Sequence, residues 1–148
     1  MSAIYWWPLA KSLVESINQD TDKEGNLVFK GVDVYAGTKQ TGKKYPCIEV
    51  TWDNESGINI HRSLQGEVGL WIDIALKTNS SNPSEHYELI YPLQLKVFKV
   101  LQKWNSVIKQ KLQISPIVEV TDVISDGDIQ RPTCTCRIVT NIKWRNSI

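Results

Sequence analysis

Residues 67–77, EVGLWIDIALK, carry the clearest structural pattern in the chain. Apolar side chains occupy every second position, at Val68, Leu70, Ile72, Ile74 and Leu76. Because successive side chains on a β-strand point to opposite faces, this alternation predicts a strand with one buried face. The intervening positions hold Glu67, Gly69, Trp71, Asp73, Ala75 and Lys77 and predict a more polar second face.

Shorter stretches on both sides of this segment predict further strands. Ile48, Val50 and Trp52 alternate with Glu49 and Thr51 directly after Pro46. The C-terminal stretch places Cys134, Cys136, Ile138, Ile142 and Trp144 on one face. Weaker patterns predict a strand over 27–35, interrupted by Gly31, and one over 118–124. The latter leads to Asp126-Gly127, a pair typical of a hairpin turn.

Apolar residues at helical spacing predict two helices. The first spans residues 8–17, with Pro8 in its opening turn. The second begins at Asn82, a good capping residue, with Pro83 in the first helical position. Its apolar stripe continues to residue 108, and Pro92 within it predicts a kink or a delayed start near Tyr91.

These elements predict one α+β domain over residues 1–148. We expect an antiparallel sheet of four to five strands, with the N-terminal helix and the long helix packed on its apolar face. A length of 148 residues suits a single domain. The three cysteines are expected to be reduced thiols, since an N-terminal secretion signal is not apparent.

Composition disfavours two broad classes. The net charge is +1, whereas dedicated nucleic-acid binders carry a clear basic excess that neutralises phosphates. Apolar runs fall far short of the ~20 residues that span a bilayer, so we expect no membrane segment.

Motifs for catalysis or metal binding are weak, and we expect no catalytic residue, no metal and no cofactor. Cys47, Cys134 and Cys136 could join His61 as zinc ligands, but the paired spacing of structural sites is missing, and core positions are the simpler interpretation. His61 and His86 are expected to be solvated. Asp126 and Asp128 suit a tight turn rather than a calcium loop.

The segment 37–44, GTKQTGKK, comes close to a phosphate-binding loop. Lys44 stands where that motif needs a magnesium-binding hydroxyl, and a strand rather than a helix is predicted to follow. A mobile basic loop is the expected alternative.

Several exposed residues are candidates for contacts with other molecules. The candidate interface comprises Trp6, Trp7, Lys39, Lys43, Lys44, His61, Arg62 and Trp71. Trp6 and Trp7 suit either a staple that holds the first helix on the sheet or an anchor for a neighbouring subunit. Lys96, Lys99 and Lys103 form either a solvated helix face or a sequence-independent contact with nucleic acid or an acidic partner. Asp73 is expected to pair with Arg137 or Lys143 across the sheet.

The order and texture of these elements resemble phage tail terminator and tail-completion (head–tail joining) proteins. The resemblance rests on the helix over 8–17, the strand opening with YPCIEV at 45–50, GLWIDI at 69–74, the long helix over 84–104 and RIVT at 137–140. It covers nearly the whole chain.

The resemblance implies a structural subunit without catalytic residues. It implies a ring of identical copies, usually a hexamer, that caps the tail tube and joins it to a head-completion protein. The protein would then reside in the virion tail, or in the cytoplasm of the bacterial host during assembly, and would touch DNA at most transiently. The loops 37–44 and 54–65 would serve as contact arms. The alternative is a small module that binds nucleic acid or an acidic partner through its lysine face.

Overall fold

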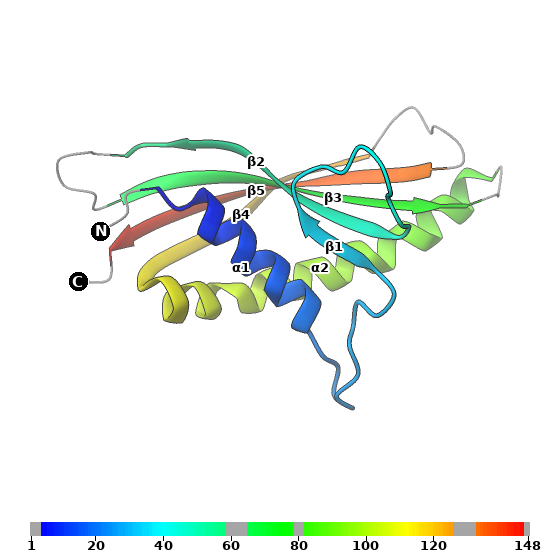
Figure 1. The fold of residues 1–148 in the computed structure, drawn as a ribbon, viewed down its shortest axis with the longest axis horizontal. Helices are drawn as coiled ribbons and strands as arrows, with labels where there is room; N and C mark the ends of the chain where they lie inside the picture. Colours follow the sequence, from blue (N-terminus) through cyan, green and yellow to red (C-terminus); the bar gives the residue numbers. More distant parts are fainter. Residues whose placement is uncertain (1–3, 59–64, 79–81, 126–132, 147–148) are drawn as a thin grey trace.

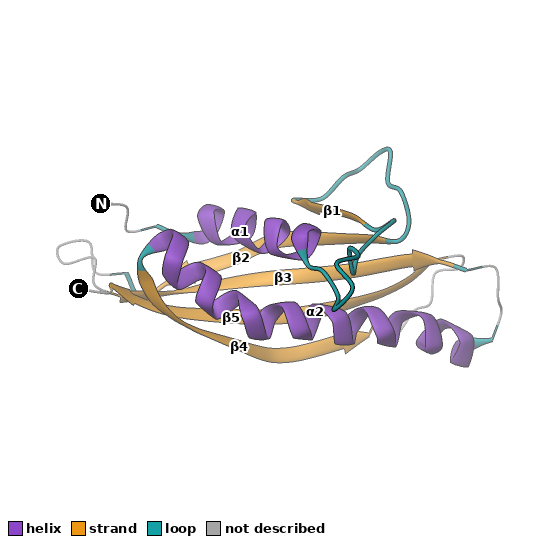
Figure 2. Ribbon diagram, turned by 90° about the horizontal axis from the view of Figure 1, so that it is seen from below, coloured by secondary structure: helices purple, strands orange, loops and turns teal. Residues whose placement is uncertain are grey.

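The computed structural model describes residues 4–58, 65–78, 82–125 and 133–146. A five-stranded sheet forms one layer, and two helices form a second layer on one of its faces (Figures 1 and 2). In chain order the elements are α1 (Trp6–Gln19), β1 (Asp33–Ala36), β2 (Cys47–Ser56), β3 (Gln65–Lys77), α2 (Pro83–Leu112), β4 (Ile114–Ser125) and β5 (Thr133–Asn146). The predicted α+β class, with both helices on one face of the sheet, is confirmed.

The sheet has the order β1-β2-β3-β5-β4, so β3 lies at its centre. β3 pairs antiparallel with β2 and β5, and β4 pairs antiparallel with β5. β1 is the exception, because it runs parallel to β2. The sheet is therefore mixed, and the antiparallel prediction holds for every pairing except that one.

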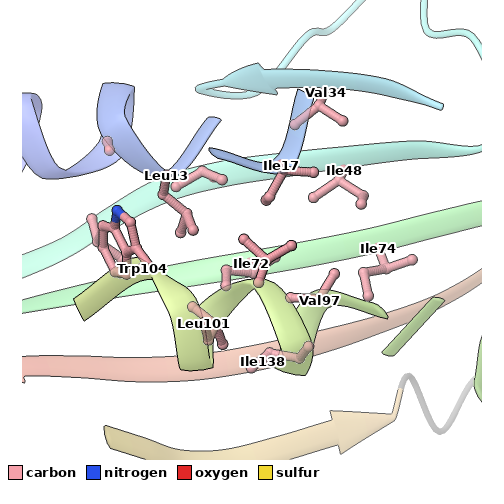
Figure 3. Packing of buried hydrophobic residues seen from close by; sticks show 14 of the residues in the cluster. Leu13, Ile17, Val34, Ile48, Ile72, Ile74, Val97, Leu101, Trp104 and Ile138 are labelled. Carbon is pink, nitrogen blue, oxygen red and sulfur yellow. The ribbon is translucent and has the colours of Figure 1, made fainter. Parts of the chain in front are cut away.

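The inward side chains of β3 form the centre of the core. Val68, Leu70, Ile72 and Ile74 have no exposed surface. Figure 3 shows Ile72 and Ile74 between Leu13 and Ile17 of α1 and Val97 and Leu101 of α2. Burying an aliphatic side chain of this size contributes about 1.5–3 kcal/mol, so this face dominates the stability of the domain.

Polar contacts tie the two helices to each other. The buried indole N–H of Trp104 donates a hydrogen bond to Ser12 Oγ at 3.1 Å. At the surface, Lys103 reaches Asp20 at 2.9 Å. The indole of Trp104 is fully buried, and its one polar atom has a partner, so it adds apolar area without an unpaired donor.

A distant side chain caps the start of α1. Tyr5, at the N-cap position, makes no side-chain cap of its own. Instead the carboxylate of Glu55, near the end of β2, accepts hydrogen bonds from the backbone N–H groups of Tyr5 at 2.6 Å and Trp6 at 3.2 Å. Burial raises the pKa of the Glu55 carboxyl, and these two hydrogen bonds offset the increase only in part. Glu55 thereby fixes the position of α1 on the sheet.

Two strands differ from the prediction. β1 starts at Asp33 rather than near residue 27, because Gly31 has φ 82° and Val32 N–H closes a turn onto the carbonyl of Phe29. β2 continues to Ser56, where a polar loop was expected from residue 53. A shift in register between Trp52 and Asn54 lets the strand stay paired with β3 while the side-chain pattern changes.

The start of α2 at Asn82–Pro83 is confirmed, and the delayed start, one of the two effects expected of Pro92, does not occur. The helix begins at Pro83, where Asn82 Oδ1 accepts the Ser84 N–H at 3.1 Å, and runs through Pro92 to Leu112. Pro92 is exposed, so its missing hydrogen bond faces solvent. Gln113 ends the helix in the left-handed conformation with φ 55°. β4 then begins at Ile114, four residues before the predicted start of this strand at residue 118. The predicted turn at Asp126-Gly127 lies outside the described residues.

Gly66 tests the packing at one end of β3. Its neighbour across the sheet is Trp144, and a Cβ at position 66 would lie 2.8 Å from Cζ2 of the indole. We expect Gly66→Ala to cost about 1–3 kcal/mol of unfolding free energy through this overpacking. Chemical denaturation measures the change.

Gly69→Ala is the matched control for that substitution. A Cβ there would first meet the exposed side chain of Asn54, which can rotate away. The expected cost is clearly smaller, and equal costs at the two glycines would contradict this account of the Trp144 contact.

Candidate functional site

Strand register brings a row of polar side chains together on the face of the sheet that the helices leave open. Tyr35 lies opposite Glu49, Glu49 opposite Asp73, and Asp73 opposite Arg137. Like charges in directly opposed positions repel each other, so the Glu49–Asp73 pair needs compensation. We call Tyr35, Lys43, Glu49, Asp73 and Arg137 the charge row.

Glu49 is the buried member of the charge row, with 5% of its surface exposed. The Tyr35 hydroxyl donates to its carboxylate at 3.0 Å, and Lys43 Nζ lies 2.7 Å from it. The hydrogen bond to Glu49 raises the pKa of Lys43. Burial, followed by the same carboxylate, raises the pKa of Tyr35. Glu49 is thus a buried charge held by one cation and one hydroxyl.

The negative charge of Asp73 is compensated by Arg137, which is one of its two predicted partners. The Nε and Nη2 atoms of Arg137 lie 2.8 and 3.2 Å from the two carboxylate oxygens. The guanidinium also covers the ring of Trp71, with Cζ 4.0 Å from its centroid. The hydrogen bond to Asp73 raises the pKa of Arg137. Lys143, the other candidate, lies instead 3.8 Å from Glu119.

A cavity of about 380 Å³ opens beside the charge row and is lined in part by Thr38, Lys43, Glu49, Asp73, Thr135 and Arg137. Each carboxylate in it already has its own cation. A charged ligand would have to displace one of these short ion pairs, which costs more than filling an unpaired site. This arrangement suits a structural network that holds the loop and the sheet together.

The loop over 37–44 folds onto this face through two of its lysines. Lys39 pairs with Asp33 at 3.0 Å and lies 4.1 Å from the ring centroid of Tyr35, whereas Lys43 pairs with Glu49. β2 follows the loop, where a phosphate-binding loop would open a helix. Of the three candidate interface lysines, Lys44 is exposed and the other two hold the loop in place.

Trp6 packs on the sheet, as expected of a staple, whereas Trp7 is exposed, as an anchor for a neighbouring subunit would be. Trp6 is half-buried and stacks on Trp52, with centroids 4.4 Å apart and planes 10° apart. Trp7 is 47% exposed and Trp52 is 48% exposed. Exposed Ile4 precedes them. We call Ile4, Trp7 and Trp52 the indole patch. Trp52 was predicted on the apolar face of a half-buried strand and was not among the candidate interface residues; it lies on that face of β2, near the end of the buried stretch.

A second apolar surface surrounds a hollow at the other end of the molecule. The hollow has a volume of about 260 Å³ and lies between the first half of α2 and the adjacent ends of β4 and β5. Its lining is Tyr87, Ile90, Tyr91, Gln94, Ser125, Cys134, Thr135 and Cys136. We call it the tyrosine hollow. Sequence analysis did not identify it, although Tyr87 and Tyr91 are one helical turn apart beside the apolar stripe.

The lysine face is only partly free. Lys96 and Lys99 are exposed, but Lys103 is occupied by Asp20. Further along α2, Lys111 pairs with Glu15 of α1 at 2.9 Å. Half of these cations therefore link the two helices.

Histidine and cysteine occupy core positions. Cys47, Cys134 and Cys136 are buried free thiols, and burial raises the pKa of Cys47 and Cys136. The expectation of a solvated His86 is wrong, because its exposed fraction is 1%. In α2, which starts at Pro83 as predicted, His86 lies on the same side as Ile90 and Leu93, toward the core.

Metal binding gains no support from residues 4–58, 65–78, 82–125 and 133–146, which contain no cluster of three His, Cys, Asp or Glu side chains able to hold an ion. His61 and Arg62 of the candidate interface, and Asp126 and Asp128, lie outside those ranges. Within the same ranges, no helix combines the length and apolar character needed to cross a bilayer.

Comparison with known proteins places the chain in no family. No protein-family model matches it, and no curated protein matches it in sequence.

Lys43→Met tests whether the charge row is structural. The substitution leaves the buried Glu49 carboxylate without its cation, and we expect a loss of about 1–3 kcal/mol of unfolding free energy. Lys39→Met is the matched control, since it removes an ion pair from the same loop whose partners are both more exposed. We expect it to cost less than about 1 kcal/mol. Equal costs in a denaturation series would contradict a special role for Glu49.

Proposed function

We propose that this protein is a structural assembly subunit that associates with copies of itself into a ring. One observation carries the proposal. Large exposed apolar side chains gather at the indole patch and around the tyrosine hollow, where Tyr87, Tyr91 and Leu95 of α2 and Val123 of β4 are all exposed. Exposed aromatic clusters of this kind are typical of protein–protein contacts.

The two surfaces lie far apart on the molecule. In Figure 1 the start of α1 lies toward the N-terminal label, and the first turns of α2 lie at the opposite end of the long axis. One chain therefore cannot cover one surface with the other. Copies of the chain can do so, and repeated contacts between different surfaces generate rings or filaments.

The charge row supports an assembly role over an enzymatic one. A general acid or base, or a nucleophile, needs a group that is free to exchange a proton with a substrate. Glu49 and Asp73 each accept short charge-assisted contacts from their own cation instead.

Tail termination is the form of assembly that we propose. The order of one short helix, the strands β2 and β3, one long helix and the hairpin partners β4 and β5 supports it. The ring would cap the tail tube of a phage or phage-like particle and bind a head-completion protein on its other side. The subunit would be found in the virion tail, or in the bacterial cytoplasm during assembly.

The direct test is the absolute mass of the purified protein, measured by light scattering over a concentration series. We expect one defined oligomer, with six times the chain mass for a hexamer, and closed rings in negative-stain electron micrographs. A monomer at every concentration would contradict self-assembly. A dimer that never grows would contradict a ring.

Binding to duplex DNA is a second candidate, favoured by the exposure of Lys96 and Lys99. Two phosphate contacts predict a slope of only about −2 in a plot of log affinity against log salt concentration. If this function holds, Lys96→Gln with Lys99→Gln abolishes a weak, salt-sensitive shift of labelled duplex DNA. If assembly alone holds, both the wild-type protein and the variant leave the duplex unbound.

A further inference from the structure

We infer that the indole patch of one copy inserts into the tyrosine hollow of a second copy, so that the ring is built from head-to-tail contacts. This inference rests on the proposed self-assembly and names the two surfaces that carry it. Shape, charge, placement and area each support it.

The indole patch is half exposed and is held in a fixed arrangement. Trp52 is held by its stack on Trp6, and Trp7 packs edge-on against Trp6 at 5.9 Å. The Glu55 cap fixes the backbone from which Trp6 and Trp7 extend. A side chain that is already ordered loses little conformational entropy on binding, so these indoles are suited to be anchors.

The tyrosine hollow matches a single indole in size and chemistry. Its volume is about 260 Å³, and none of the described residues that line it is charged. An apolar cavity of roughly 150 Å³ is large enough to take up benzene, so the hollow has room for the larger indole ring. Tyr91, 59% exposed, stands at its rim, and buried Cys134 and Cys136 form part of its wall.

Opposite charges border the two surfaces. Lys11 lies 5.8 Å from the ring centroid of Trp7 on the outer side of α1. Glu88 is exposed on α2 at the position after Tyr87. Lys11 and Glu88 carry opposite charges, so the approach of one copy's indole patch to the next copy's α2 is favoured. Such charge complementarity guides orientation more than it adds affinity.

The placement of the two surfaces favours a head-to-tail contact over a two-fold dimer. Trp52 shares the helix-covered face of the sheet with Val50, and Tyr87 lies on α2, which covers that same face. Each surface also adjoins a free sheet edge. β1 pairs with β2 only as far as Val50, and β4 is the last strand on the other side. Joining two unlike surfaces at opposite edges leaves one of each exposed for the next copy.

The area is adequate for the centre of an interface. Trp7 and Trp52 from one copy and Tyr87 and Tyr91 from the next are each about half exposed. At roughly 150–250 Å² for an aromatic side chain, they would bury on the order of 400 Å² together. A standard interface buries about 1,600 Å² in total, and its energy is concentrated in a central cluster of this kind.

Two complementary variants test the contact. The first, Trp7→Ser with Trp52→Thr, removes the indoles of the indole patch and keeps the tyrosine hollow. The second, Tyr87→Ser with Tyr91→Glu, blocks the tyrosine hollow and keeps the indole patch. We expect each variant alone to be monomeric by light scattering. Mixed together, they retain one intact contact, so the expected product is a 1:1 heterodimer that grows no further.

Leu89→Ser is the matched control. Leu89 is exposed and lies between Tyr87 and Tyr91 in the sequence. On the helix, however, its side chain points to the side away from the hollow. This variant is expected to keep the wild-type mass. Circular dichroism establishes that each variant is folded. If the double tryptophan variant does not fold, Trp7→Ser alone, which leaves the Trp6–Trp52 stack intact, takes its place and is expected to weaken assembly at least tenfold.

The outcomes separate this contact from the proposed function. Variants that are folded and keep the wild-type oligomer overturn the contact but leave self-assembly standing. Folded variants that are monomeric both alone and mixed also overturn it, because a head-to-tail contact must be restored in the mixture. A monomeric wild-type protein overturns both proposals.

Discussion

The architecture depends on the two-sided environment of β3. This strand pairs along its whole length with β5 and over most of its length with β2, so both of its edges are satisfied. Its inward side chains lie beneath two helices, and its outward ones carry charge. A shift of one residue in its register would bury Asp73 in the apolar core and expose Ile72 and Ile74. The cost of that exchange keeps the sheet in one arrangement.

The two opposed carboxylates at the centre of the outward face are each neutralised, which separates this part of the surface from the apolar surfaces suited to contacts. Lys43 from the loop over 37–44 pairs with Glu49 of β2, and Arg137 of β5 pairs with Asp73 of β3. Contacts with other molecules are therefore left to the two ends of the domain, where the apolar side chains are exposed because the neighbouring elements stop short. β1 ends before it reaches Trp52, and the open edge at β4 leaves the flank of α2 uncovered. Exposure at these places follows from the lengths of the elements.

Patterns that act within one element were predictable from the sequence. The alternation of β3 and the cap at Asn82 are of this kind, and the Asp73–Arg137 pair followed from alternation on two strands. Features that depend on neighbouring elements were not predictable. The start of α2 was predicted, but not which side of its first turn faces the core, where His86 lies. Trp52 is exposed because β1 ends before it. Burial of Glu49 required a loop to fold across a sheet face, and loop sequences carry little information about such placement.

The Glu55 cap joins two segments that are 50 residues apart in the chain. One carboxylate terminates the hydrogen-bond ladder of α1 while its own backbone extends the ladder of β2 and β3. The first turn of the helix and the last residues of that strand therefore move as one rigid lever, with the tryptophans at its tip. A load applied to the free end of β2 would be transmitted to α1 without first disturbing the core.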